Sequence, residues 1–141
     1  MANNLKIKLD KEAIVPTKGH SDDAGLDLFA AESGTIPARG FKAFKTGVHV
    51  EIPCGCVGLL TSKSGLMLKG ITSTGTIDAG YTGEILAVLY NHTDTDFEVE
   101  RGMKITQLVI MQLLYYSSLT IDVCENEKLR DDDGFGSTGC F

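Results

Sequence analysis

Apolar and polar residues alternate in short stretches along most of the chain, which is the period of a strand with one buried face. Glycine, proline, asparagine and aspartate separate these stretches, and these residues favour tight turns. Residues 66–69 are compatible with one turn of helix. We predict strands at residues 5–9, 24–30, 44–52, 57–60, 85–90, 97–99, 105–116 and 119–123.

Many short strands with frequent turns predict an all-β fold, either a β-sandwich or a barrel. The chain has 141 residues, 43% of them hydrophobic, which is enough for one domain with a real core. No internal repeat or linker divides it. Its character changes near the end, where it becomes charged and then rich in glycine. We expect a β-domain over residues 1–124 and a C-terminal arm over residues 125–141.

The formal net charge of −6 argues against binding to a nucleic-acid backbone, which needs clustered lysine and arginine. A small phosphorylated ligand stays possible, because two or three well-placed donors are enough for it. No apolar run approaches the roughly 18–20 residues that cross a bilayer. Residues 1–4 do not resemble a signal peptide. We therefore expect no membrane partner, and a location in the cytoplasm or, for a viral or phage protein, inside the host cell.

The four cysteines are Cys54, Cys56, Cys124 and Cys140. The spacing Cys54-Gly55-Cys56 is not that of a zinc ribbon, and no histidine pair accompanies it. We expect free thiols in a reducing compartment and no metal site built from these side chains.

Residues 75–84, Gly75-Thr76-Ile77-Asp78-Ala79-Gly80-Tyr81-Thr82-Gly83-Glu84, place an acid, an aromatic ring and three glycines between two predicted strands. Glycine permits a positive φ or a close approach of the backbone to a ligand. One interpretation is a tight hairpin whose turn is capped by Asp78. The other is a hairpin that holds a ligand, with Asp78 as a base. Taken alone, this stretch favours the capped turn.

Three further positions carry polar chemistry inside or beside predicted strands. Asp27 should face away from its apolar neighbours and, taken alone, is best explained as a solvated surface carboxylate. Ser62-Lys63-Ser64-Gly65 ends a strand with two hydroxyls and a cation. Gln107 interrupts a mostly apolar strand, and a hydrogen-bonded core or edge amide explains it equally well.

The C-terminal stretch 134–139 formally fits G-x-G-x-x-G, but no helix can follow it, so a Rossmann site is excluded. A P-loop is also absent. The composition alone predicts disorder. However, Arg130, Ser137, Thr138 and the glycine N–H groups can bind phosphate, and Phe135 offers a ring face to a flat base. A mobile arm that becomes ordered over a nucleotide would use this mixture.

Five segments together, in this order, resemble the five motifs of the homotrimeric, all-β dUTP pyrophosphatase (dUTPase) family. They are residues 24–28 (AGLDL), 62–66 (SKSGL), 75–84, 102–108 (GMKITQL) and 130–139. Each segment alone is a weak signal, but five in order leave little room for chance. The resemblance implies a jelly-roll-like sandwich or barrel of the dUTPase β-clip type with a flexible arm. It also implies hydrolysis of dUTP to dUMP and pyrophosphate, which keeps uracil out of DNA and supplies dUMP for thymidylate synthesis.

The resemblance also implies roles for the residues of the hairpin. Asp78 matches the general base that activates the water attacking the α-phosphorus. Tyr81 matches the ring that packs on the deoxyribose and disfavours a 2′-hydroxyl. The backbone groups that read uracil and exclude the methyl group of thymine match Gly75, Thr76 and Ile77.

The other matched residues surround the phosphates. Asp27 matches an acid near the α-phosphate and the metal, and the phosphate-chain ligands match Lys63, Ser64, Gly65 and Gln107. In the family, Mg²⁺ is held mainly by the triphosphate and water, so Asp27 would reach it through water at most.

In the arm, the γ-phosphate contacts match Arg130, Ser137 and Thr138. The ring over uracil, with the glycine that follows it, matches Phe135 and Gly136. The family builds each site from three subunits, with the arm arriving from a neighbour, so the resemblance implies a homotrimer.

Three positions depart from the family pattern. Lys63 and Lys104 stand where arginine is usual, and each offers a point charge in place of a planar fork. Asp131 replaces a glycine and completes a run of three acids. Like charge there opposes closure of the arm over a triphosphate unless the carboxylates point outward or Mg²⁺ offsets them.

Two alternatives to a simple dUTPase stay open. A bifunctional dCTP deaminase/dUTPase needs an acid–base residue near the exocyclic amine of the base, and among the five segments Glu84 is the spare glutamate, which we expect to be structural. A regulatory binding protein with the dUTPase fold would act through partner contacts. An all-β scaffold protein would have no use for residues 130–139.

Overall fold

A computed structural model describes residues 4–123. Within that range the chain forms ten strands and one four-residue helix. No helix there is long and apolar enough to cross a membrane. The elements are β1 (Lys6–Leu9), β2 (Gly25–Phe29), β3 (Gly34–Ile36), β4 (Phe41–Lys45), β5 (Val48–Glu51), β6 (Cys56–Thr61), α1 (Ser64–Met67), β7 (Ile71–Ile77), β8 (Leu86–Asn91), β9 (Phe97–Val99) and β10 (Lys104–Gln112).

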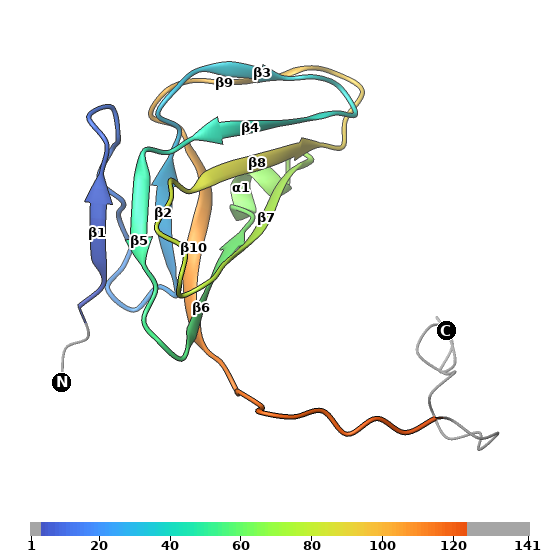
Figure 1. Ribbon diagram of the computed structural model, residues 1–141. Helices are drawn as coiled ribbons and strands as arrows, with labels where there is room; N and C mark the ends of the chain where they lie inside the picture. Colours follow the sequence, from blue (N-terminus) through green and yellow to red (C-terminus); the bar gives the residue numbers. More distant parts are fainter. Residues whose placement is uncertain (1–3, 124–141) are drawn as a thin grey trace.

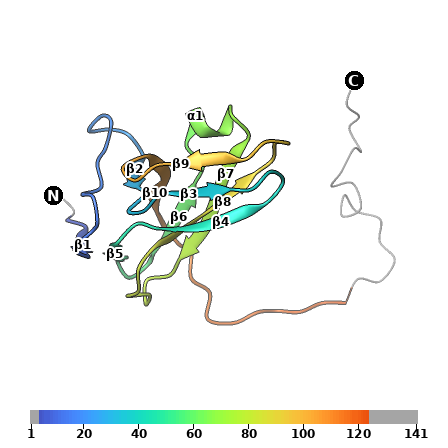
Figure 2. The ribbon, with the colours of Figure 1, turned by 90° about the horizontal axis from the view of Figure 1, so that it is seen from above.

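The largest sheet has six antiparallel strands in the order β2-β10-β6-β7-β8-β4. Strands β1 and β5 form a two-stranded sheet, and β3 and β9 form another. In Figure 1, β4 and β8 run nearly across the direction of β2 and β10, and Figure 2 shows the same crossing from above. The curled sheet and its two smaller partners enclose the core. The predicted all-β fold is confirmed.

The core consists of two clusters of side chains that the alternating pattern points inward. One cluster is centred on Phe44, Leu89 and Ile105, and the other on Leu28 and Leu108, all at most 1% exposed. Burial of such side chains from water is the main stabilising contribution to a domain of this size.

The predicted strand 44–52 is wrong in one respect, because the structure divides it into β4 and β5. Gly47 has φ = 67°, in the left-handed region that favours glycine, and it turns the chain from the large sheet into the β1–β5 sheet. The buried Thr46 hydroxyl donates to the Ile85 carbonyl at 2.5 Å. The alternation continues through this corner because both strands bury one face, so periodicity alone does not reveal it.

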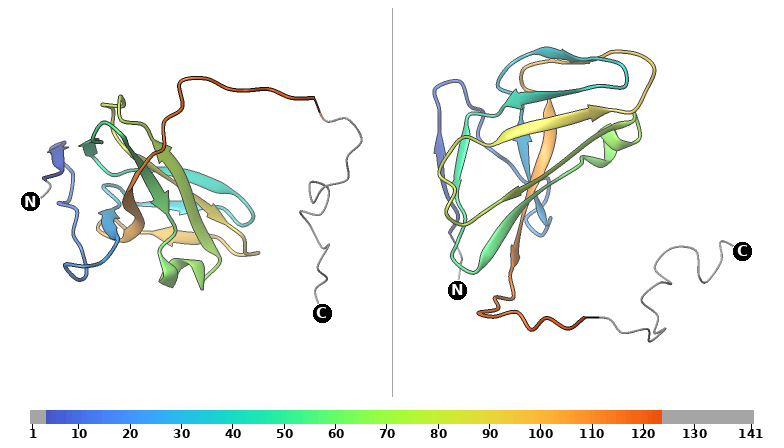
Figure 3. Two further views of the ribbon diagram at one scale, coloured as in Figure 1. Left: turned by 90° about the horizontal axis from the view of Figure 1, so that it is seen from below. Right: turned by 45° about the vertical axis from the view of Figure 1, so that its right-hand side comes forward.

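The predicted strand 119–123 is also wrong for the described chain. Strand β10 ends at Gln112, and residues 113–123 form no strand. They run away from the body of the domain (Figures 1 and 3), with Leu114 92% and Val123 85% exposed. A strand needs a neighbouring strand for its hydrogen bonds, and the described chain offers none at this place. The predicted arm, residues 125–141, lies outside the described residues.

The first predicted strand forms, but it is not half-buried. All four residues of β1 are classed as exposed, because β1 pairs with β5 alone and its apolar side chains, Ile7 and Leu9, stay 36% and 37% exposed. Cys54 and Cys56 flank a turn at Gly55 and are free thiols, as predicted. The other two cysteines lie outside the described residues.

Candidate active site

Strand β7 changes its pairing partner halfway along its length. Residues Ile71 to Ser73 pair with β8, whereas Thr74 to Ile77 pair with β6. The two arms of the 75–84 hairpin therefore separate toward the tip. The separation leaves a hollow of about 280 Å³, lined by Leu60, Thr74, Gly75, Thr76, Ile77, Asp78, Tyr81, Glu84, Ile85, Leu86 and Val88. All five residues that the sequence assigns to base, sugar and catalysis in this segment line this one hollow.

Asp78 directly follows β7 and is exposed at the hollow. Its backbone carbonyl accepts a hydrogen bond from the Tyr81 N–H at 3.0 Å, which closes the turn. Within residues 4–123 its carboxylate makes no hydrogen bond, so the side chain does not cap this turn.

Tyr81 is held in place by its own hairpin. Its hydroxyl donates to the Glu84 carbonyl at 2.8 Å, and a methyl group on Gly83 would lie 2.5 Å from that hydroxyl. None of the hairpin glycines has a positive φ. Gly83 is needed for close packing under the ring, and Gly75 lies against Leu60, so these glycines serve close approach and not an unusual turn.

The returning arm of the hairpin is attached to the corner between β4 and β5. The Gly47 N–H donates to the Glu84 carboxylate at 2.9 Å, and the Ile85 N–H donates to the Val48 carbonyl at 2.8 Å. Glu84 therefore has a structural role, as predicted. These bonds place the base of the hairpin relative to the rest of the domain.

A second cluster forms around Asp27 on β2. Its side chain is only 7% exposed; one oxygen lies 2.5 Å from the Lys63 ammonium and the other 3.4 Å from that of Lys104. The predicted solvated carboxylate is wrong because a backbone bridge to Thr17 covers the outer edge of β2 while the two lysines cover the carboxylate. A carboxylate this buried requires such partners. Lys104 is visible in the sequence as a departure from the family pattern, but no local signal connects it to Asp27.

Gln107 pairs with Asp27 on one side and with Thr61 on the other, and Thr61 pairs with Thr74. Directly opposite residues share a face of a sheet. The four side chains therefore form one polar row across β2, β10, β6 and β7, a pattern that no local sequence signal reveals. The Gln107 amide donates to the Ser62 carbonyl at 3.1 Å and lies directly over Gly25, where a Cβ would overlap it.

Ser62 continues the β6 side of β7 one residue beyond the end of β6. Its hydroxyl accepts from the Ser73 N–H at 2.9 Å and donates to the Ser73 carbonyl at 3.0 Å. The next residues turn into α1, which leaves Ser64 and Gly65 exposed at the start of the helix. The hydroxyl of Ser64 is thus available to a ligand on the surface.

The single chain does not bring these two groups into one cavity. The hollow beside Asp78 is not lined by Asp27, Lys63, Ser64, Gly65 or Gln107. The predicted arm residues, Arg130, Phe135, Gly136, Ser137 and Thr138, lie outside the described residues. Among residues 4–123, no group of three histidine, cysteine, aspartate or glutamate side chains could hold a metal ion.

The strands, the hollow and the polar row define a small all-β protein whose candidate site lies between the parted arms of a hairpin. A family model described as dUTPase matches residues 11–139. A deoxyuridine 5′-triphosphate nucleotidohydrolase from Kluyveromyces lactis is 39% identical to this chain over 142 residues, covering 99% of this chain and 96% of that protein. One from Clostridium tetani is 43% identical over 140 residues, covering 96% of each.

Solved structures agree with this similarity. The Staphylococcus bacteriophage 80alpha dUTPase with dUPNHPP has a TM-score of 0.85 and 33% identity, covering 98% of this chain and 99% of that one. A mutant dUTPase from phage phi11 of S. aureus, described as revealing the coordination of a structural Mg(II) ion, has a TM-score of 0.79 and 30% identity, covering 86% and 98%. The chain belongs to the dUTPase family.

Gly25→Ala should displace the Gln107 amide, because the added methyl group occupies its place. We expect the side-chain amide signals of Gln107 to shift in an NMR spectrum, with a loss of about 1–3 kcal/mol in the free energy of unfolding. Gly65→Ala is the matched control, because open space surrounds a Cβ at that position. Unchanged Gln107 signals in Gly25→Ala would contradict the placement of this side chain.

Proposed function

We propose that this chain hydrolyses dUTP to dUMP and pyrophosphate, with Asp78 activating the water that attacks the α-phosphorus. One observation carries the proposal. The Asp78 carboxylate stands exposed at a hollow of about 280 Å³ and makes no hydrogen bond within the described residues. It is therefore available to orient and deprotonate a water molecule, provided that the phosphorus lies within reach.

The pairing of β7 supports recognition of uracil by the backbone. Beyond Ser73, β7 has β6 on one side and no ladder partner on the side of β8. Because successive residues of a strand point their backbone groups to opposite sides, those of Thr76 face this side and are available to hydrogen-bond the edge of a base. Gly75 and Ile77, which pair with β6, would flank the base as part of the same template. The Tyr81 ring, fixed by its bond to Glu84, would pack on the deoxyribose.

The cluster around Asp27 supports binding of the phosphates. Two ammonium groups face one carboxylate, so the cluster keeps a net positive charge for an anionic ligand. Gln107 and Ser64 add neutral donors beside it. Asp27 would then act by holding the two lysines, and a water-mediated contact between Asp27 and the metal stays a prediction.

We further propose that the reaction uses Mg²⁺. The donor set fits a metal that arrives with the triphosphate, because no carboxylate cluster is present in the described residues and both Asp27 oxygens already face lysines. Mg²⁺ favours such sites, where it keeps several waters and binds substrate phosphates. When bound, it would neutralise charge on the phosphate oxygens.

We propose a homotrimer in which each site combines the hollow of one subunit with the Asp27 cluster of another and an arm from a third. Two observations support it: the two groups do not share a cavity in one chain, and residues 113–123 extend away from the domain with exposed apolar side chains. Residues 1–124 would form the domain and residues 125–141 the arm. The free thiols of Cys54 and Cys56 support a reducing, cytoplasmic or host-cell location.

Asp78→Asn should leave dUTP binding nearly intact and lower pyrophosphate release by a factor of about 10²–10⁴, because the amide cannot accept the proton of the water. Binding is measured by calorimetry and turnover by a pyrophosphate assay. Asp22→Asn, an exposed acid away from the hollow, should behave like the unaltered protein. Near-normal turnover of Asp78→Asn would contradict the assignment of the base.

Pyrophosphate release from dUTP, dTTP, dCTP and UTP, each with Mg²⁺, tests the proposed substrate. We expect dUTP to be strongly preferred and EDTA to abolish its turnover. Rejection of one methyl group contributes only about 1–3 kcal/mol in a compliant pocket, so a larger preference over dTTP indicates a rigid hairpin. Release of ammonia from dCTP would favour the deaminase alternative, and binding without turnover would favour a regulatory protein.

Deletion of residues 131–141 should remove most of the turnover and leave the oligomer intact, because the arm closes over the site without holding the subunits together. Sedimentation gives the mass and the pyrophosphate assay gives the turnover. A monomeric deletion product would contradict the proposed role of the arm as a lid.

A further inference from the structure

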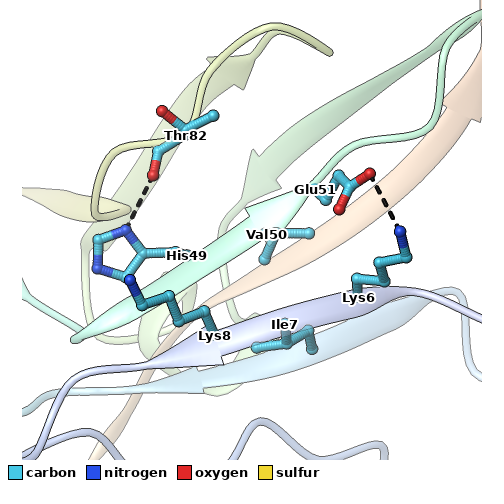
Figure 4. A pocket seen from close by; sticks show the side chains of 7 residues that line it. All are labelled: Lys6, Ile7, Lys8, His49, Val50, Glu51 and Thr82. Carbon is cyan, nitrogen blue, oxygen red and sulfur yellow. Dashed lines mark hydrogen bonds and ion pairs between the residues drawn. The ribbon is translucent and has the colours of Figure 1, made fainter.

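A second hollow of about 280 Å³ lies where β1 and β5 meet the returning arm of the Asp78 hairpin. Its lining residues are Lys6, Ile7, Lys8, His49, Val50, Glu51 and Thr82. Figure 4 shows the His49 ring reaching from β5 to the backbone of Thr82. The His49 side chain is 22% exposed, so its ring is partly shielded from water at this junction.

Both nitrogens of the His49 ring face hydrogen-bond acceptors. Nδ1 lies 3.0 Å from the Thr82 carbonyl oxygen, and Nε2 lies 3.1 Å from a carboxylate oxygen of Asp10. A carbonyl oxygen and an ionised carboxylate can only accept. A neutral imidazole has one N–H and can donate to one of them, whereas the protonated ring donates to both. The geometry therefore fits the protonated ring.

The two partners of His49 belong to different parts of the molecule. Asp10 directly follows β1, and its backbone N–H donates to the Gly47 carbonyl at 2.8 Å, so it is tied to the corner before β5. Thr82 lies in the hairpin, next to Tyr81 and four residues after Asp78. The bonds from Thr46, Gly47 and Val48 hold the hairpin at residues 84 and 85, near its base. His49 holds it closer to the tip.

We propose that His49 is a positioning residue for the Asp78 hairpin, which it holds firmly when its ring is protonated and releases in part when the ring loses a proton. The proposal concerns a site outside the one that binds the nucleotide. Its consequence for dUTP rests on the proposed function, but its consequence for the hairpin itself does not.

The charges around His49 decide the direction of the pH dependence. The hydrogen bond to Thr82 is the largest cause that raises the pKa of His49 above its ordinary value of 6.5; the bond and charge of Asp10 also raise it, while partial burial and Lys8 lower it. Lys8 stands directly opposite His49 on β1.

The remaining charged groups near the ring have partners of their own. Lys6 pairs with Glu51 at 3.5 Å, and Glu84 accepts from the Gly47 N–H. The net effect is a raised pKa of His49. The two hydrogen bonds from its ring are therefore both present below about pH 6.5, and one of them is lost as the pH rises through the raised pKa.

Amide hydrogen exchange of residues 78–85 in the full-length protein, corrected for the intrinsic effect of pH, tests the hairpin directly. We expect protection to fall roughly tenfold as the pH rises, since one charge-assisted hydrogen bond is lost. The midpoint should coincide with the pKa of His49 followed by NMR of its ring. Protection that does not change with pH would overturn the proposal.

Two variants separate a pH-dependent role from a merely structural one. His49→Phe keeps a ring but makes neither bond, so protection should be low at every pH. Asp10→Asn should lower both the pKa of His49 and the midpoint of the loss of protection, and it keeps the test valid if His49→Phe does not fold. Unequal shifts of the two quantities in Asp10→Asn would overturn the proposal.

His92→Phe is the matched control. The His92 ring lies 2.7 Å from the hydroxyl of Thr72, which can donate or accept, so a neutral ring satisfies this contact. The pH profile of the hairpin should be unchanged in this variant. A loss of the profile here would assign the effect to another part of the molecule.

The loss of the proton from His49 should change the KM for dUTP but not kcat. If the chain hydrolyses dUTP, its KM for dUTP should rise roughly tenfold over the same pH range with little change in kcat, because the hairpin becomes looser before the nucleotide binds. In His49→Phe the KM should be raised and flat with pH. A chain that does not hydrolyse dUTP but shows the exchange profile would disprove the proposed function and support the inference about His49.

Discussion

The site depends on how the backbone of β7 satisfies its hydrogen bonds. Each buried N–H and C=O group needs a partner, and β7 takes its partners from β8 up to Ser73 and from β6 after it. At the change, the hydroxyl of Ser62 serves both backbone groups of Ser73. These bonds extend the β6 side of β7 past the end of β6. On its other side β7 parts from β8 after Ser73, and the gap becomes the hollow beside Asp78.

The same separation would leave the hairpin without support if nothing else held it. The corner between β4 and β5 provides that support, because the left-handed Gly47 brings the start of β5 against the returning arm. Hydrogen bonds from Thr46, Gly47 and His49 then reach residues 82–85 from one short segment. A turn far from Asp78 in the sequence thus sets the position of the hairpin that carries it.

The charged cluster shows a second relation between fold and chemistry. Asp27 is buried at the edge of the large sheet, and its two partners are Lys63 and Lys104, the two lysines that stand where the resemblance to the family motifs leads one to expect arginine. Both departures therefore meet at one carboxylate. Two compact ammonium groups can each approach one oxygen of it as point charges, without the planar geometry that a bidentate arginine requires.

The sequence by itself determined the all-β class and most strand positions, and it led to the proposed role of Asp78, because these follow from local alternation, turn residues and five ordered segments. It did not reveal the corner at Gly47, the burial of Asp27, or the row that joins Gln107 to Thr61 and Thr74. The two-residue alternation of apolar and polar positions shows which face of a strand is buried, but it does not show which strand lies beside it. That choice is made by contacts between residues far apart in the chain, so only the tertiary structure decided where β7 parts from β8 and which polar side chains meet.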